Sequence, residues 1–143
     1  MKLTHTMTYK DVTFTKLAII KKKDKLTLEN INKDVSDKKG VYLIVDDITE
    51  EIYYIGITTN KKGFKARLGS HIADSNKRLL LTDKNDPKMN GRYGKIKNLL
   101  DKCSVYVHVP EMVMYKGIEI DPTLGIEDSL IKEFQPICNT AGL

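Results

Sequence analysis

Two short runs of β-branched and aromatic residues, at positions 41–45 and 52–58, lie on either side of a polar and acidic stretch. Residues of these types favour extended strands, and the polar stretch between them has the length of a hairpin loop. The pattern therefore predicts an antiparallel β-hairpin near the middle of the chain.

Helical periodicity begins shortly after this hairpin. The residues at 58–63 are typical of turns, and apolar residues then recur at spacings of four and seven. Such spacing places apolar side chains near one face and predicts a helix from Phe64 to about Leu81. A last helix is predicted from about Thr123 to Phe134, between proline-containing start and stop signals.

The remaining segments are less regular. Residues 103–109 alternate clearly and predict a strand, whereas residues 9–25 alternate weakly and allow one or two strands. Residues 92–102 predict a short basic helix. Residues 111–121 are interpreted as a loop with room for a short strand at 113–115.

Together these elements predict a small α+β fold. We expect a mainly antiparallel sheet of about three central strands, flanked by helices, which the N-terminal segment can extend. Residues 1–39 are interpreted as an N-terminal extension that contains strands and packs on the core. Residues 40–143 are interpreted as the core itself, with a basic helical insertion at about 73–98. A chain of 143 residues can bury such a core without disulfides or metals.

Composition is that of a soluble globular protein, with 41% hydrophobic and 30% charged residues. The apolar runs are too short to span a bilayer, and the N-terminal residues lack the apolar region of a secretory signal. Cys103 and Cys138 form no Cys-x-x-Cys pair and are expected to be reduced thiols. We therefore expect a cytoplasmic protein with no membrane partner.

Positive charge is concentrated in one part of the chain. Residues 61–102 carry 12 Lys or Arg against 4 Asp or Glu, in a chain of net charge +5 and pI about 9.1. Such a segment is typical of a surface that binds a polyanion, although solvated lysine-rich surfaces are also common. The candidates for contacts with nucleic-acid phosphates are Lys61, Lys62, Lys65, Lys77, Arg78, Arg92, Lys95 and Lys97.

Each arm of the predicted hairpin carries a tyrosine near a glycine, in Gly40-Val41-Tyr42 and in Tyr54-Ile55-Gly56. An odd-numbered loop centred near Ile48 would place the tyrosines opposite each other, with both hydroxyls on one face and the Cβ atoms about 5.5 Å apart. An even-numbered loop would place them on opposite faces, because a one-residue slip inverts a strand. Alternatively, both tyrosines fill half-buried strand positions without a chemical role.

Three further residues could act with the tyrosines. Arg67 and His71 lie four residues apart on the first predicted helix, so they project from the same side. Glu127 lies on the apolar side of the last helix, where a carboxylate usually has a partner.

A set of residues resembles, in type and order, the signature of the GIY-YIG nuclease superfamily: Tyr42, Tyr54, Gly56, Arg67, His71, Glu127 and Asn139. Residues 127–139 resemble the last helix of that family, with a Glu, an apolar pair, an aromatic residue, then Pro and Asn. The resemblance covers about residues 40–139 and is closest to the compact stand-alone members, including small restriction endonucleases.

The resemblance implies a metal-dependent DNA endonuclease that leaves 5′-phosphate and 3′-hydroxyl ends. Glu127 would supply an oxygen ligand for Mg²⁺ or Mn²⁺, and Arg67 would bind phosphate oxygens in a bidentate manner. Asn139 would either hydrogen-bond near the site or fix the chain after the last helix. The implied catalytic set is Tyr42, Tyr54, Arg67, His71, Glu127 and Asn139.

The residue that activates water is left open by the sequence. A phenol of ordinary pKa near 10 is about 0.1% ionised at neutral pH, a cost of about 4 kcal/mol unless a cation lies nearby. His71, Lys61 and Lys62 are the candidates for that cation, and Tyr42 is favoured as the base. Alternatively, His71 takes the proton and the tyrosines only position water.

Other functions and assemblies also follow from these patterns. Cutting both strands of a duplex would need two copies or successive nicks, which favours a homodimer or a higher homo-oligomer. One alternative function is a non-catalytic nucleic-acid-binding protein that retains the nuclease fold, although every matched position is intact. Another is a basic structural or ribonucleoprotein component.

Overall fold

The computed structural model describes residues 6–22, 24–79 and 102–139. Within them, six antiparallel strands form one sheet, in the order β1-β2-β6-β4-β5 with β3 paired to β2. The α+β class is confirmed, but the prediction of about three central strands is wrong. The strands are β1 (Thr6–Tyr9), β2 (Val12–Lys22), β3 (Leu26–Glu29), β4 (Gly40–Asp46), β5 (Ile52–Thr58) and β6 (Cys103–His108).

Strand β2 explains why the sequence pattern underestimates the sheet. Its register with β6 shifts between Lys16 and Ala18, so a bulge interrupts the alternation of inward and outward side chains. Phe14 packs on one face of the sheet and Ile20 on the other, although an unbroken strand would place both on the same face. The period of two is therefore hidden in this segment.

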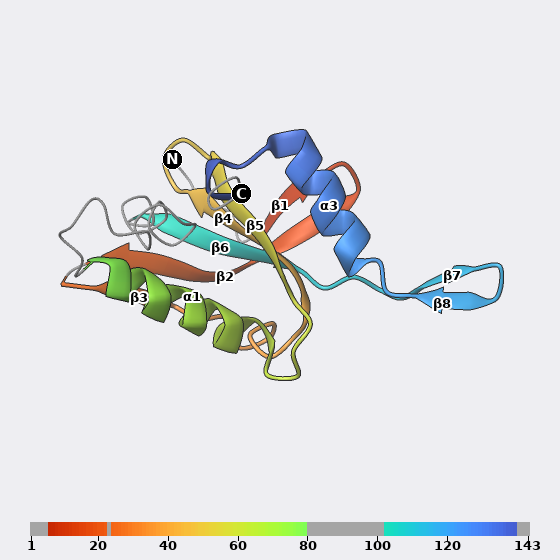
Figure 1. Cartoon of the computed structure of the whole chain (residues 1–143), viewed down its shortest axis with the longest axis horizontal. Helices are drawn as coiled ribbons and strands as arrows, with labels where there is room; N and C mark the ends of the chain where they lie inside the picture. The colour runs from red at the N-terminus through yellow and green to blue at the C-terminus, as the bar shows by residue number, and fades with distance from the viewer. Residues whose placement is uncertain (1–5, 23, 80–101, 140–143) are drawn as a thin grey trace.

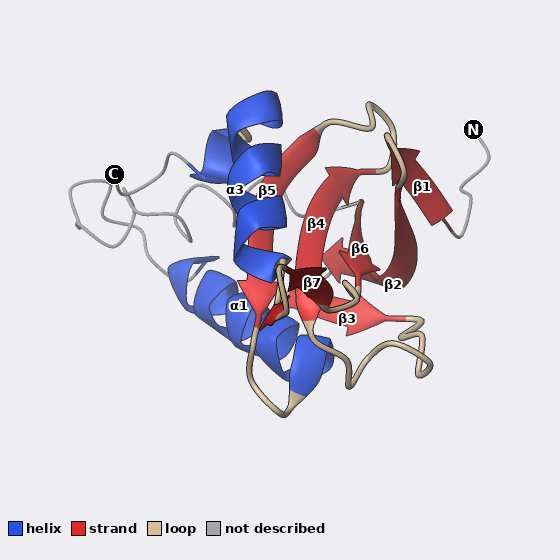
Figure 2. Ribbon diagram, turned by 90° about the vertical axis from the view of Figure 1, so that its right-hand side faces the viewer, coloured by secondary structure: helices blue, strands red, loops and turns tan. Residues whose placement is uncertain are grey.

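Two helices cover opposite faces of the sheet, as Figures 1 and 2 show. Helix α1 (Gly63–Leu79) packs on the face that carries Tyr42, and α3 (Thr123–Phe134) packs on the face that carries Val41. Of the three predicted helices, the first and the last are confirmed, although the predicted end of the first at about Leu81 lies outside the described residues. Helix α3 has the predicted bounds, and α1 begins one residue earlier than predicted.

The loop before β4 holds the start of α1. The amides of Phe64 and Lys65 donate to the carbonyls of Lys38 (3.0 Å) and Ser36 (2.8 Å), so two donors that a helix leaves without acceptors are satisfied. Gly63 has a φ of +80°, and a Cβ there would lie 2.4 Å from the carbonyl carbon of Asp37. This close approach requires glycine.

Asp46 holds the acidic turn between β4 and β5. Its Oδ1 accepts hydrogen bonds from the amides of Ile48 (2.8 Å) and Thr49 (2.9 Å), and its Oδ2 accepts one from the Tyr53 hydroxyl (2.8 Å). The hydrogen bond from the Thr49 amide makes the largest contribution to lowering the pKa of Asp46. The hydrogen bond to Asp46, followed by burial, raises the pKa of Tyr53 to about 12.

Stability is expected to fall at alkaline pH because of Tyr53. An unfolded tyrosine ionises near pH 10, whereas folded Tyr53 has a pKa of about 12. Its contribution to the free energy of unfolding is therefore complete below pH 10 and is lost as the pH rises towards 12, by roughly 1–2 kcal/mol. Urea unfolding at about pH 9 and about pH 11.5 measures this loss. The Tyr53→Phe variant should show a smaller loss, and an equal loss in both proteins would contradict the expectation.

A second hairpin, β7 (Val113–Tyr115) and β8 (Ile118–Ile120), projects from the body between β6 and α3 (Figure 1). Lys116 and Gly117 have φ values of +49° and +82°, the backbone of a type I′ turn. The short strand at 113–115 is confirmed. Its partner strand was not predicted, because Lys-Gly is a weaker hairpin signal than Asn-Gly or Asp-Gly.

Two predicted features lie largely outside the described residues. The short basic helix at 92–102 falls almost entirely within residues 80–101. Most of the basic insertion at about 73–98 does so too, while residues 73–79 continue α1. Among the helices that the structure does describe, none is long and apolar enough to cross a membrane.

Candidate functional site

Three aromatic side chains from β4, β5 and α1 meet on the α1 face of the sheet. The Tyr42 hydroxyl lies 2.9 Å from Nε2 of His71 and shares a hydrogen bond with it. The Tyr54 ring centroid lies 5.9 Å from that of Tyr42 and 5.0 Å from that of His71. Tyr42 and His71 are fully buried and Tyr54 nearly so. We call these three residues the aromatic cluster.

The register of the hairpin sets the spacing of the two tyrosines. Tyr42 is paired with Gly56, and Tyr54 is paired with Ile44. The tyrosines therefore share a face, as an odd-numbered loop requires, but they are diagonal neighbours and not directly opposite. The pairing shifts between Ile44 and Val45, so Tyr53 is an extra residue in the β5 arm.

Gly56 makes room for the Tyr42 ring. A Cβ at position 56 would lie 2.5 Å from both Cζ and the hydroxyl oxygen of Tyr42. Real Cβ atoms do not approach other atoms so closely, so any larger residue would push the phenol away from His71. Gly56, two residues after the second tyrosine, therefore makes room for the first tyrosine across the strand pair.

Helix α1 carries both Arg67 and His71. Its apolar side, with Phe64, Leu68 and Ile72, packs into the core and brings His71 to the buried hydroxyl of Tyr42. Arg67 is half-buried and lies one turn earlier on the same side. The predicted i, i+4 pair is thus present, with His71 in the aromatic cluster.

Asn139 attaches the end of the described chain to β5. Its Oδ1 accepts a hydrogen bond from the Ile55 amide (2.8 Å), and its Nδ2 donates to the Ile55 carbonyl (2.7 Å). Strand β5 is the last in the sheet order, so Asn139 satisfies backbone groups at an open edge. The sequence left two roles open for Asn139, and these hydrogen bonds match the role of fixing the chain after the last helix. Ile55, whose backbone they bind, is next to Tyr54.

Glu127 lies in the other layer of the fold. It is half-buried on α3, which packs against β4 and β5, and it lies between the buried residues Thr123 and Leu130 along the helix. Helix α3 covers the sheet face opposite to the one that α1 covers. Glu127 and His71 therefore belong to helices on opposite faces of the sheet. The two layers share β5, the edge strand that bears Tyr54.

Glu127 is the carboxylate predicted to bind a divalent metal. Among the described residues, no three or more His, Cys, Asp or Glu side chains converge as a metal site. Mg²⁺ is commonly held by one or two carboxylates together with waters and substrate phosphates. The half-buried carboxylate of Glu127 fits that kind of site.

The predicted basic residues are only partly described. Lys61, Lys62 and Lys65 are exposed around the start of α1. Lys77 and Arg78 belong to the last turn of α1, where the structure describes only the backbone, and Arg92, Lys95 and Lys97 lie outside the described residues.

Lys38 and Lys39 were missed by the sequence analysis. With Lys61, they line a hollow of about 340 Å³ that Asp37 and Asp121 also border. The signal available in the sequence was their position next to Gly40, directly before the first strand of the hairpin.

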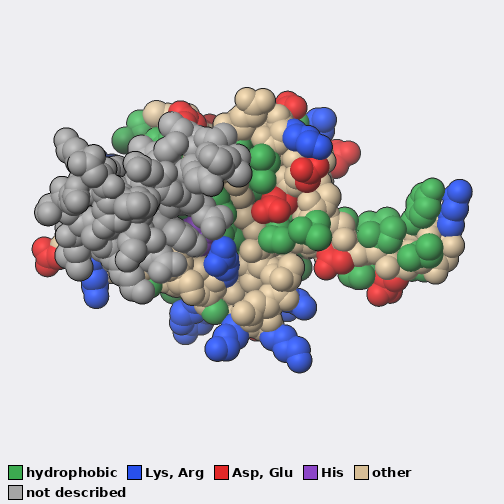
Figure 3. All heavy atoms as spheres, in the orientation of Figure 1, with side chains coloured by type: hydrophobic (Ala, Val, Ile, Leu, Met, Phe, Trp, Pro, Cys, Tyr) green, Lys and Arg blue, Asp and Glu red, His purple; other side chains and the backbone are tan. Residues whose placement is uncertain are grey.

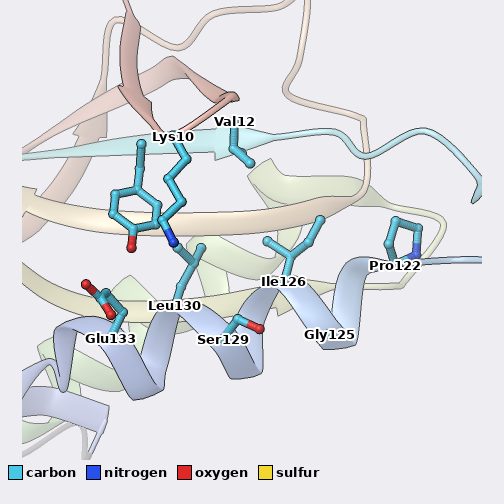
Figure 4. A pocket seen from close by; sticks show the side chains of 9 residues that line it. Lys10, Val12, Pro122, Gly125, Ile126, Ser129, Leu130 and Glu133 are labelled. Carbon is cyan, nitrogen blue, oxygen red and sulfur yellow. The ribbon is translucent and has the colours of Figure 1, made fainter.

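A separate hollow of about 510 Å³ lies between the β1–β2 turn and α3 (Figure 4). Its lining is mostly apolar, with Val12, Ile126 and Leu130, and Lys10 and Glu133 border it. It lies on the α3 face of the sheet and contains none of the predicted site residues. It is therefore distinct from the aromatic cluster.

Comparison of the chain with protein-family models, with curated proteins and with solved structures found no match in any of the three. The functional interpretation therefore depends on the geometry and chemistry of the site itself.

Proposed function

We propose that the chain is a metal-dependent DNA endonuclease of the GIY-YIG type, hydrolysing phosphodiester bonds to 5′-phosphate and 3′-hydroxyl products. The observation that carries the proposal is the hydrogen bond between Tyr42 and His71, with the Tyr54 ring against both. Residues 29 positions apart in the chain meet there, and their types are those needed to move a proton from water.

The Tyr42–His71 pair can act as one proton-transfer unit. Tyr42 would pass its proton to Nε2 of His71 and, once substrate binding brings a water molecule to its buried hydroxyl, would accept a proton from that water as a phenolate. With ordinary pKa values for phenol and imidazole, this transfer costs about 5 kcal/mol before the attraction between the resulting charges is counted. That attraction is strong at a separation of 2.9 Å away from water. This contact therefore suits Tyr42 as the base, with protonated His71 as the cation that stabilises its phenolate.

Arg67 and Glu127 supply the charges that the phosphate requires. The guanidinium of Arg67, one turn from His71, is always protonated and can bind two phosphate oxygens. Glu127 would hold Mg²⁺ or Mn²⁺, which stabilises negative charge on the phosphate when bound. Lys61, Lys62 and Lys65 would contact neighbouring phosphates, so DNA affinity should fall steeply as salt increases.

Cleavage of supercoiled plasmid tests the proposal directly. The intact protein is expected to nick the plasmid with Mg²⁺ or Mn²⁺ and to be inactive with EDTA. DNA binding should persist when the metal is removed, because lysine contacts do not need it. Absence of cleavage on duplex, single-stranded and branched DNA would contradict an endonuclease.

The second candidate is a nucleic-acid-binding protein that keeps the fold without cutting. The complete burial of Tyr42 and His71 favours it, because a buried Tyr–His hydrogen bond also satisfies two polar groups in a core. Tight, salt-sensitive DNA binding without cleavage would identify this alternative.

A further inference from the structure

The hollow of about 340 Å³ that Lys38, Lys39 and Lys61 line is located at one end of the central strands. We call it the basic hollow. Strand β4 begins there, and its first residue, Gly40, is paired with Thr58 at the end of β5, while β6 ends next to β4. Figure 3, in the orientation of Figure 1, shows Lys and Arg side chains gathered at the lower edge of the body, where the loop between β5 and α1 lies. Four separate segments of the chain therefore meet at the basic hollow, positioned by the sheet.

Positive charge exceeds negative charge around the basic hollow. Its lining has three lysines against two aspartates, a net charge of +1. Of the aspartates, Asp37 is exposed, and Asp121 accepts hydrogen bonds at Oδ1 from the amide (3.0 Å) and the hydroxyl (2.6 Å) of Thr123. All three lysines are exposed, so their ammonium groups can reach an anion in the hollow. A phosphodiester, with one negative charge, would balance this lining.

A buried hydroxyl in the lining lacks a partner. Thr58 is only 2% exposed, and its Oγ1 has no hydrogen-bond partner among the described residues. An unpaired buried hydroxyl destabilises a fold, whereas valine would fill the same space without that cost. Packing therefore does not account for a threonine at this position. Because Thr58 lines the hollow, a change of its side-chain rotamer would let the hydroxyl donate to an oxygen bound there.

Apolar residues complete the lining of the basic hollow. They are Val109, Pro110 and Met112, and the first and last of them are 43% and 51% exposed. A nucleotide has the same two kinds of surface, a charged phosphate and a base with a flat face that stacks. A volume of about 340 Å³ is at the small end of the range for ligand sites. We propose that the basic hollow binds one nucleotide of a DNA strand, with the phosphate on the three lysines and the Thr58 hydroxyl and the sugar and base against the apolar residues.

Such a site would hold the substrate strand next to the aromatic cluster. Thr58 is two residues beyond Gly56, about 7 Å along β5, and strand alternation places both on the face that carries Tyr54. Gly56 is the residue that makes room for the Tyr42 ring. The choice of DNA as the source of the nucleotide rests on the proposed function.

Binding of a short fluorescent thymidine oligonucleotide, measured by anisotropy in EDTA, tests the site without cleavage. Thr58→Val removes the hydroxyl but no charge, and it should raise the Kd about threefold to tenfold. Lys39→Ala should raise the Kd about tenfold. Lys33→Ala is the matched control, because Lys33 is an exposed lysine of the same loop as Lys39 but does not line the hollow. This control should change the Kd less than about twofold.

Competition with small molecules identifies the group that is bound. Thymidine 5′-monophosphate should displace the oligonucleotide at least about tenfold better than thymidine, which lacks the phosphate. Equal competition by these two compounds would overturn the proposal. Competition by N-acetylglutamate as strong as that by the monophosphate would also overturn it, because it would indicate a site for acidic peptides.

The variants separate this proposal from the proposed function. If either Thr58→Val or Lys39→Ala bound the oligonucleotide as tightly as Lys33→Ala, the nucleotide site would be refuted, whether or not the intact protein nicks plasmid. If both variants bound more weakly while the intact protein did not nick plasmid, the nucleotide site would stand and the endonuclease would not. Circular dichroism of each variant verifies that the fold is unchanged.

Discussion

Replacing Glu127 by alanine is expected to abolish metal-dependent nicking, lowering the rate by about a thousandfold or more, while DNA binding persists. The reason is that Glu127 is the carboxylate proposed to hold the ion, so the substitution removes that ligand. Among the described residues, no cluster of three or more acidic, His or Cys side chains could replace it. Plasmid nicking and a gel-shift assay on the same preparation separate cleavage from binding.

A matched control is available on the same helix. Glu133 is an exposed carboxylate of α3, and Glu133→Ala should leave nicking within about twofold of the intact protein. If Glu127→Ala nicked the plasmid at the same rate as Glu133→Ala, a role of Glu127 in the metal site would be refuted.

Arg67→Ala should lower the rate of plasmid nicking about a hundredfold to a thousandfold, because the charge that stabilises the phosphate is lost.

Tyr42→Phe is expected to lower nicking by about a hundredfold to ten-thousandfold. The substitution keeps the ring that packs across Gly56 but removes the hydroxyl that binds His71. It should destabilise the fold by about 1–2 kcal/mol, because the buried Nε2 of His71 loses the hydroxyl with which it shares a hydrogen bond. Single-turnover cleavage rates, together with urea unfolding, separate these two effects.

Tyr53→Phe provides the matched control for Tyr42→Phe. It also removes a tyrosine hydroxyl with one hydrogen-bonded partner, Asp46, but that contact lies at the hairpin turn. Nicking by Tyr53→Phe should therefore stay close to that of the intact protein, despite a comparable loss of stability. Equal losses of nicking in the two variants would mean that Tyr42 acts only through packing.

The local elements could be predicted because short-range chemistry decides them. Residues 41–45 and 52–58 are dense in β-formers, and α3 lies between proline-containing start and stop signals, so the hairpin and the helix are visible without a tertiary structure. The i, i+4 spacing of Arg67 and His71 likewise follows from helix geometry. Strand β2 was one exception, since its bulge disguises the alternation, and β8 was another.

The contacts within the site could be decided only by the tertiary structure. Composition offered His71, Lys61 and Lys62 as neighbours for a tyrosine, and the docking of α1 on the sheet selected His71 for Tyr42. Asn139 pairs with Ile55, 84 residues away, because the chain after α3 returns to the open edge of β5.

For this protein, then, the sequence by itself determined which residue types are present and, for the β4–β5 hairpin, α1 and α3, on which elements they lie. The register of β4 against β5, the docking of α1 and the exposure of the β7–β8 arm were decided only by tertiary packing. The physical reason is range: propensity and periodicity act over a few residues, whereas these contacts depend on how distant segments share one core.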